Sequence, residues 1–275
     1  MNVKELQKKA VEVRKGALDI IYRAGAGHIG GTLSSADVIT ALFYEIMRYD
    51  PKNPTLADRD RFILSKGHCI EGYLYALADC GFFPKEELKT FCQFGTRLIG
   101  HPNRDVPGIE MNTGALGHGL SCGCGMAKAG KLDHKDYRVF VLMGDGEINE
   151  GSVWEAAMFA ASHKLDNLYA ILDRNRLQIS GCTEDVLRLE PLKKKWQDFG
   201  FYVREVDGNN MQELLDAFAE LDKVTGQPKL LFMNTVKGKG ISFMENNPPW
   251  HHAIPNQEQY EKATAELAFQ AKELK

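Results

Sequence analysis

The chain has 275 residues, of which 44% are hydrophobic and 26% are charged, and its formal net charge is −3. These values are ordinary for a soluble globular protein with a substantial core. The net charge argues against a dedicated nucleic-acid binder, which usually carries a basic surplus, and no apolar run approaches the roughly 18 residues of a membrane helix. Because the N-terminal sequence MNVKELQKKAVEV is charged and lacks a signal-peptide core, we expect a cytoplasmic protein.

Apolar residues recur with helical spacing over residues 3–23, which predicts a first helix. A glycine-rich turn with the sequence AGAGHIGGTLSS follows it. Ser34 and Asp37 then form an S-x-x-D pattern, so we expect them to cap a second helix that ends near Met47. The sequence RDRFILSKGH predicts a short strand that ends near Ser65.

Six cysteines are present, and none belongs to a Cys-x-x-Cys motif. A zinc ribbon or a thioredoxin-like redox motif is therefore not expected. Two of the cysteines lie in GLSCGCGMAKAG, where the neighbouring small residues predict a tightly packed helix. We interpret Cys122 and Cys124 as small hydrophobic residues of that helix.

From Tyr137 onward, short apolar segments alternate with helical ones. The predicted strands are RVFVLM, NLYAILD, FYVREVD and KLLFMNTV, at 138–143, 167–173, 201–207 and 229–236. Helices are expected over 150–164, from Asn210 onward, and in the tail at 256–275. This alternation predicts an α/β fold with a parallel sheet that is covered by helices on both faces. We expect a single domain over residues 1–275.

The first of these strands ends at Gly144-Asp145-Gly146. Ligands of open α/β sheets bind beyond the carboxyl ends of the strands, and flanking glycines let the backbone turn sharply and approach a ligand. A carboxylate at this place suits a phosphate only when a divalent cation lies between them. The next strand ends close to Asn175 and Leu177, whose amide and carbonyl oxygens would be further ligands.

Gly-Asp-Gly by itself also fits a plain turn in which Asp145 caps the following helix. Because Asn175 stands at the neighbouring strand end, the two residues together favour a site for a metal-bound diphosphate. The helix between them begins near Glu150, and its N-terminal N–H groups favour a nearby anion.

These residues also carry a resemblance to a known family. The element from Gly144 to Asn175 resembles the thiamine diphosphate motif. The segments AGAGHIGGTLSSADVITALFYEIMRYDP, RDRFILSKGHCIEGYLYALADCG and LIGHPNRDVPGIEMNTGALGHGLSCGCGMA resemble, in order and spacing, the N-terminal, diphosphate-binding part of transketolase. The match covers roughly residues 10–252. It implies a thiamine diphosphate-binding domain that uses Mg²⁺ or Ca²⁺ and transfers a two-carbon ketol unit from a ketose phosphate to an aldose phosphate.

The resemblance also implies roles for individual residues. The implied metal ligands are Asp145, Asn175 and the carbonyl of Leu177. The implied cofactor-binding residues are His68, Gly114, Ala115, Leu116, Asp145, Gly146, Glu147, Asn175 and His251. The implied catalytic residues are His28, His68, His101, His251 and Glu150. An imidazole at such positions can donate to a phosphate oxygen or exchange a proton with a sugar hydroxyl near neutral pH.

Two acidic residues and a late histidine also match positions of the family. Glu150 and Glu155 match positions that, in the family, join a chain of carboxylates between paired active sites, and such carboxylates titrate as a coupled set. As ordinary helix residues, both would also favour the first turn. His251 occupies the late histidine position of the family, which usually has glycine next, whereas this chain has His252. Either histidine is a candidate to reach the site.

A full-length transketolase is more than twice this length, and its second domain supplies the glutamate that activates the cofactor ring. The resemblance therefore implies the N-terminal subunit of a split transketolase. The pyrimidine-binding and C-terminal domains would lie on a separate chain, in an α₂β₂ assembly. The small-residue stretch from Gly151 to Ala161 is a candidate for self-association.

Three alternatives stay open. The first keeps the cofactor and changes the sugars, as in deoxyxylulose phosphate synthesis or ketol transfer with sulfosugars and other unusual sugars. The second is a non-catalytic homologue, against which the intact aspartate, asparagine and histidine positions argue. The third is a stand-alone nucleotide-binding enzyme, but no G-x-x-x-x-G-K-[ST] motif is present, and TVKGKGIS lacks its spacing.

Overall fold

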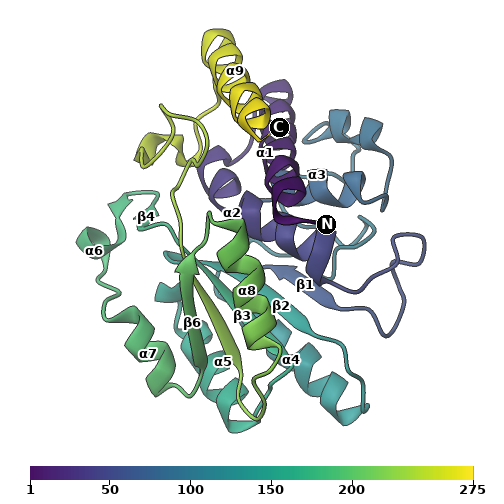
Figure 1. Ribbon diagram of the computed structural model, residues 1–275, viewed down its shortest axis with the longest axis vertical. Coiled ribbons are helices and arrows are strands. Elements are labelled where there is room, and N and C mark those ends of the chain that lie inside the picture. Colours follow the sequence, from purple (N-terminus) through teal and green to yellow (C-terminus); the bar gives the residue numbers. More distant parts are fainter. Residues whose placement is uncertain (275) are drawn as a thin grey trace.

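Figure 1 shows the computed structural model of the chain, which describes residues 1–274. Its central sheet has five parallel strands in the order β1-β2-β3-β7-β6. These strands are β1 (Arg61–Leu64), β2 (Val139–Gly144), β3 (Leu168–Arg174), β7 (Lys229–Asn234) and β6 (Tyr202–Asp207). A separate antiparallel hairpin consists of β4 (Leu177–Gln178) and β5 (Gly181–Cys182).

Helices of three types, α, π and 3₁₀, surround the sheet. The α-helices are α1 (Val3–Ala24), α2 (Ile29–Ala41), α3 (Glu71–Asp79), α4 (His118–Leu132), α5 (Gly151–Ser162), α6 (Thr183–Val186), α7 (Leu192–Asp198), α8 (Met211–Leu221) and α9 (Gln257–Glu273). The π-helix is η1 (Leu42–Ile46), and the 3₁₀ helices are η2 (Lys85–Thr90), η3 (Glu147–Asn149) and η4 (Pro248–His251).

Alternate residues of each strand belong to two different hydrophobic clusters, as the two-residue period of a strand requires. In β2, Phe140 and Leu142 pack in the cluster that contains residues of α2, α3 and α8. Val139, Val141 and Met143 pack in the cluster that contains residues of α4, α5 and α7. The sheet therefore has helices on both faces, which confirms the predicted α/β fold.

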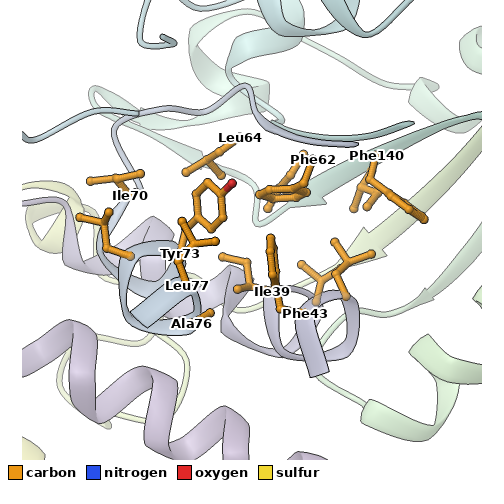
Figure 2. Packing of buried hydrophobic residues seen from close by; sticks show 14 of the residues in the cluster. Ile39, Phe43, Phe62, Leu64, Ile70, Tyr73, Ala76, Leu77 and Phe140 are labelled. Atoms are coloured by element: carbon orange, nitrogen blue, oxygen red, sulfur yellow. The ribbon is translucent and has the colours of Figure 1, made fainter. Parts of the chain in front are cut away.

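Figure 2 shows the packing on the first of these faces. Phe62 of β1 and Tyr73 of α3 lie edge to face, with ring centroids 4.9 Å apart, and Phe43 of η1 contacts both rings. All three side chains are almost fully buried. This rigid layer supports the carboxyl end of β1, from which Lys66 and His68 follow.

The prediction that Ser34 and Asp37 cap the second helix is wrong. Helix α2 begins directly after His28, and both residues lie inside it, where every residue of the helix is buried. The Ser34 hydroxyl donates to Asp173 at 2.7 Å, and Asp37 forms a buried ion pair with Arg14. A helix that is covered on all sides needs partners for its polar side chains, and these partners come from the tertiary structure.

The tail helix α9 lies beside α1, so the first and last helices of the described chain are neighbours (Figure 1). Tyr22 of α1 and Tyr260 of α9 stack with ring centroids 4.0 Å apart, and the Tyr260 hydroxyl donates to Asp19 at 2.6 Å. No helix in residues 1–274 is both long enough and apolar enough to cross a membrane.

Candidate active site

The turns that follow β2 and β3 meet at the carboxyl edge of the sheet. Strands β2 and β3 pair in parallel with Gly144 opposite Asp173, so the residues that follow each strand emerge side by side. Here a cavity of about 360 Å³ opens between the strand ends and the surrounding loops. Its lining residues are His28, Gly31, Lys66, His68, Gly114, Leu116, Gly144, Asp145, Gly146, Glu147, Asn175, Leu177, Gln178, Ile179, Ser180, Lys237 and His251.

Asp145 is the acidic centre of this cavity and is only 2% exposed. Its Oδ1 accepts the Gly146 N–H at 2.9 Å, and its Oδ2 accepts the Arg176 N–H at 2.5 Å and Nη1 of Arg174 at 3.1 Å. Burial and the nearby Asp173 carboxylate raise the pKa of Asp145 to about 6, although Arg176 and Arg174 oppose this shift. The carboxylate is held in one orientation, but the positive charge of Arg174 does not offset the effects of burial and of Asp173.

The turn after β3 adds two oxygens. Asn175 Oδ1 accepts the Leu177 N–H at 3.1 Å, and the Leu177 carbonyl accepts from Nζ of Lys237 at 3.1 Å. Arg176 between them has φ +67°, a left-handed conformation that non-glycine residues rarely adopt. Such strain is found where a turn must aim neighbouring groups at a site.

The donor set fits a hard divalent cation. Residues 1–274 contain no group of three or more His, Cys, Asp or Glu side chains that could hold a metal alone. Asp145 offers a carboxylate oxygen, Asn175 an amide oxygen and Leu177 a carbonyl oxygen. Mg²⁺ and Ca²⁺ prefer such oxygens, and Mg²⁺ is usually completed by phosphate oxygens and water. The shortage of positive charge at Asp145 is what such a cation would relieve.

Glu147 also lines the cavity, but both of its carboxylate oxygens already have protein partners. Oε1 accepts the Ser65 hydroxyl and the Gly117 N–H, the latter at 3.0 Å, and Oε2 accepts the Gly144 N–H at 3.0 Å. Burial raises the pKa of this carboxyl. Glu147 therefore ties the end of β1, the start of α4 and the end of β2 together.

Four of the histidines named from the sequence come together around His28. The ring centroid of His28 lies 5.1 Å from that of His68, 6.3 Å from that of His101 and 5.6 Å from that of His251. His28, His68 and His251 line the cavity, whereas His101 does not. The ring of His252 is exposed, yet its centroid is 4.3 Å from that of His28.

The inner imidazoles are neutral at physiological pH. Burial lowers the pKa of His28 to about 4, with further contributions from His252 and His101. Burial and the Lys66 charge lower the pKa of His68 to about 2, and burial and the Lys237 charge lower that of His251 to about 3. Burial also lowers the pKa of His101. A neutral imidazole has one donor and one acceptor nitrogen, so each ring can exchange hydrogen bonds with a hydroxyl.

Two lysines line the cavity that we did not predict. Lys237, which is 3% exposed, contacts the Leu177 carbonyl and Nδ1 of His251, the latter at 2.8 Å. Lys66 donates to the Gly31 carbonyl at 2.8 Å and pairs with Asp173. Lys66 is the second residue after β1, and Lys237 is the third residue after β7, within the TVKGKGIS segment. The same rule about strand ends that selected Asp145 would have found both.

The remaining sequence-predicted residues differ in their placement. Gly114, with φ +136°, and Leu116 line the cavity, while Ala115 is exposed and does not. A Cβ at Gly114 would meet the His101 ring at 2.7 Å, so only glycine allows this approach. Glu150 and Glu155 are exposed at the start of α5 and do not line the cavity.

Comparison with known proteins identifies the family. Residues 6–274 match the family model for "Transketolase, thiamine diphosphate binding domain". The chain belongs to the transketolase family. The family prediction is thus confirmed, and with it thiamine diphosphate as the cofactor that this domain binds.

Similar proteins include separate transketolase subunits and a longer transketolase. It is 50% identical to an apulose-4-phosphate transketolase subunit of Phocaeicola vulgatus, over 100% of this chain and 98% of that protein. It is 43% identical to the 6-deoxy-6-sulfo-D-fructose transketolase subunit SqwG of a Clostridium species, over 96% of each. Human transketolase is 40% identical, but the match covers 90% of this chain and only 39% of that protein.

Solved transketolase structures give the same result. The structure from Campylobacter jejuni superposes with a TM-score of 0.91 at 32% identity, over 98% of this chain and 44% of that one. The chain thus spans less than half of this solved transketolase and nearly the full length of the two proteins named as subunits.

Proposed function

We propose that this chain is the thiamine diphosphate-binding subunit of a two-chain transketolase, which transfers a two-carbon ketol unit from a ketose phosphate to an aldose phosphate. The carrying observation is the cavity at the carboxyl edge of the sheet, where oxygen ligands and neutral imidazoles face one space. The near-equal length of the relatives named as transketolase subunits supports the separate partner chain. The α₂β₂ assembly belongs to this proposal.

The metal end of the cavity is built around Asp145. In our proposal, Asp145, Asn175 and the Leu177 carbonyl would hold Mg²⁺ or Ca²⁺, which would supply positive charge for binding a diphosphate. Lys237 would then turn from the Leu177 carbonyl toward the diphosphate, because an ammonium next to a bound cation gains by facing an anion. Gly146 keeps the wall low enough for close approach, while Glu147 shapes that wall without touching the ligand.

When bound, thiamine diphosphate supplies a nucleophilic carbon that carries the two-carbon unit between sugars. The chain's own part is to bind and orient. His68 and His251 lie beside Lys66 and Lys237, respectively, and would donate to diphosphate oxygens. His28 and His101 would exchange hydrogen bonds and protons with sugar hydroxyls, for which neutral imidazoles are suited.

Residues outside the cavity would serve the assembly. Glu150 and Glu155 are exposed at the start of α5, and Met158 and Phe159 of the same helix are 55% and 41% exposed. Large exposed apolar side chains beside carboxylates are typical of a surface that another chain covers. We propose that this face of α5 contacts a second chain, where the two glutamates join the shared carboxylates.

The choice of sugar is the second candidate. The names of the two subunit relatives point to apulose 4-phosphate and a sulfofructose in place of the common ketose phosphates. Both reactions would use the same cavity, and they differ only in the part of the sugar beyond the transferred unit. Activity with these sugars would refine the proposal and leave its reaction type unchanged.

The test is a paired assay. The chain is purified alone and together with a chain that resembles the pyrimidine-binding half, and both samples receive thiamine diphosphate and Mg²⁺. Xylulose 5-phosphate, apulose 4-phosphate and 6-deoxy-6-sulfofructose are offered in turn as donors, with ribose 5-phosphate or glyceraldehyde 3-phosphate as acceptor. We expect ketol-transfer products, detected by mass spectrometry, only from the sample that contains both chains.

Asp145→Asn is the control variant, and it should abolish the product together with Mg²⁺-dependent cofactor binding measured by calorimetry. Equal activity from the chain alone would refute the two-chain proposal. A stable complex that binds cofactor and yields no product from any donor would refute catalysis and favour a non-catalytic homologue.

A further inference from the structure

The segment after η4 is fixed to the rest of the fold by Trp250. This side chain is 8% exposed and lies edge to face with Phe243, at a centroid distance of 5.3 Å. Its carbonyl oxygen lies against Gly30, where a Cβ would come within 2.7 Å. The backbone that leads into His251 and His252 is therefore held against the start of α2.

His252 stands at the rim of the cavity. Its ring lies closer to His28 than the rings of His68, His101 and His251 do, at 4.3 Å and an interplanar angle of 63°. His28 lines the cavity, whereas His252 is exposed and does not. The anchored backbone thus sets an exposed imidazole next to His28, a ring that lines the cavity.

Within the described part of the chain, the ring nitrogens of His252 have no hydrogen-bond partner. Its ring lies edge to face with that of His28, and the buried Glu71 carboxylate is within electrostatic range. The ring of His251 differs, because Lys237 already contacts its Nδ1. An imidazole whose ring nitrogens have no hydrogen-bond partner, next to a ring that lines the cavity, is available to a ligand that enters past it.

We propose that His252 is a specificity-determining residue that binds the part of the sugar phosphate beyond the transferred two-carbon unit. This inference rests on the proposed function. The metal end of the cavity lies at Asp145, so a group at the rim reaches only the portion of a substrate that extends outward. Hydroxyls and anionic substituents are the groups that an imidazole binds there. Glycine at this position would leave a wider opening without a hydrogen-bonding group.

The experiment compares variants in the complex with the partner chain. His252→Gly should raise KM for the sugar substrate about tenfold with kcat within twofold, the effect of losing one hydrogen bond in binding. His252→Asn keeps a donor and an acceptor and should recover at least half of that loss on a logarithmic scale. His134→Gly changes an exposed histidine after α4 whose φ of +54° glycine accepts, and this matched control should behave as the wild type.

Two further measurements separate the possible causes. Cofactor affinity and complex assembly, followed by calorimetry and sedimentation, should not change in His252→Gly. An unchanged KM for every sugar would overturn the proposal. A raised KM that is accompanied by weaker assembly would also overturn it, because the ring would then serve the contact between chains.

Failure of the proposed function is recognised separately, because the wild-type complex would then transfer no ketol unit. In that case, this chain is prepared with isotope-labelled histidines, and sugar phosphates are titrated into its complex while the histidine signals are followed by NMR. The His252 signal is assigned by its loss in His252→Asn. A shift of that signal that the signal of His134 does not share supports the inference. The absence of such a shift for all the sugar phosphates refutes it.

Discussion

The two ends of the central sheet both bury an aspartate, but they balance its charge differently. At the amino end, Asp60 accepts hydrogen bonds from Arg48 and from Arg138, at distances between 2.8 and 3.2 Å. Burial by itself would raise the pKa of Asp60, but these contacts lower it below the ordinary value. At the carboxyl end, burial raises the pKa of Asp145 to about 6.

The difference lies in the number of cations available. Asp60 forms ion pairs with two guanidiniums, those of Arg48 and Arg138, which also pair with Asp136 and Asp222. Asp145 forms an ion pair with one guanidinium, that of Arg174, whose second terminal nitrogen is shared with Glu184 and Glu190, at 2.9 and 3.0 Å. The amino end is therefore a completed ion cluster that stabilises the fold. The carboxyl end leaves Asp145 with one guanidinium partner, an arrangement that fits the metal site proposed above.

The largest expected effect is a difference between the two aspartates in how much their substitution lowers the free energy of unfolding. Asp60→Asn leaves two arginines without their buried partner and should lower the free energy of unfolding by about 3–5 kcal/mol. Asp145→Asn removes a carboxylate whose charge is already disfavoured, and in metal-free protein at pH 6 it should change the free energy of unfolding by less than about 1 kcal/mol. Urea unfolding of both variants in the presence of a chelator measures the difference. Equal losses would mean that Asp145 is an ordinary structural residue.

A smaller effect concerns the pH dependence of the same pair. The folded-state pKa of Asp145 lies near 6, above the ordinary 3.8, so its contribution to stability is present below pH 3.8 and is lost as the pH rises through 6. The free energy of unfolding of wild type minus that of Asp145→Asn should fall by about 2 kcal/mol between pH 4.5 and 7.5 without metal.

Asp60 serves as the internal comparison for this measurement. Its pKa is lowered, so its contribution is present above the ordinary value of 3.8 and is lost only as the pH falls through the folded-state pKa. The corresponding difference for Asp60→Asn should stay flat over the same pH range. A flat profile for both aspartates would contradict the charge imbalance at the carboxyl end.

The smallest expected effect concerns support from outside the sheet. Gln270 of α9 donates to the Gly240 carbonyl at 2.7 Å, and Glu266 accepts from the Ser242 N–H at 2.6 Å. These contacts hold the segment between Lys237 and His251, and the amino end of the sheet has no contact with this helix among the element pairs that pack closely in residues 1–274. Gln270→Ala should weaken thiamine diphosphate binding by about three- to fivefold, the effect of one lost hydrogen bond, and leave the Asp60 cluster unaffected.

Calorimetric titration of the cofactor into the complex measures this change. Gln257→Ala, also on α9, is the matched control, because that side chain bonds to the exposed Glu261 of its own helix. Equal losses from the two variants would show that α9 acts only through general stability.

Most of the fold could be predicted from the sequence, because its elements depend on local patterns. The strand RVFVLM is apolar throughout its length after the first residue, as a strand buried on both faces must be, and β2 is found at 139–144. The segment 174–200 received no element, yet it contains the β4–β5 hairpin, α6 and α7. These elements are short, and α7 is held by the burial of Trp196 against residues of the sheet cluster, so its sequence carries little periodicity of its own.

The residues of the site also divide into those that local sequence predicts and those that depend on distant contacts. Asp145 and Asn175 were predictable because each directly follows a strand, and the ends of adjacent parallel strands must meet. The capping role of Ser34 was wrong because the pattern describes only neighbours in the chain, whereas the Ser34 hydroxyl is bound by Asp173, 139 residues away. Lys237 was overlooked because its segment was compared with a nucleotide-binding motif and not with its place after β7.

The sequence by itself determined the parallel α/β architecture, the family and the strand-end positions of Asp145 and Asn175, because periodicity and motif spacing are properties of the chain. Only the tertiary structure decided which side chains share the cavity. His28, His68, His101 and His251 come from four distant segments, and His252 joins them through an anchored backbone. Their neutral state, like the raised pKa of Asp145, follows from burial and nearby charge, which exist only once the chain has folded.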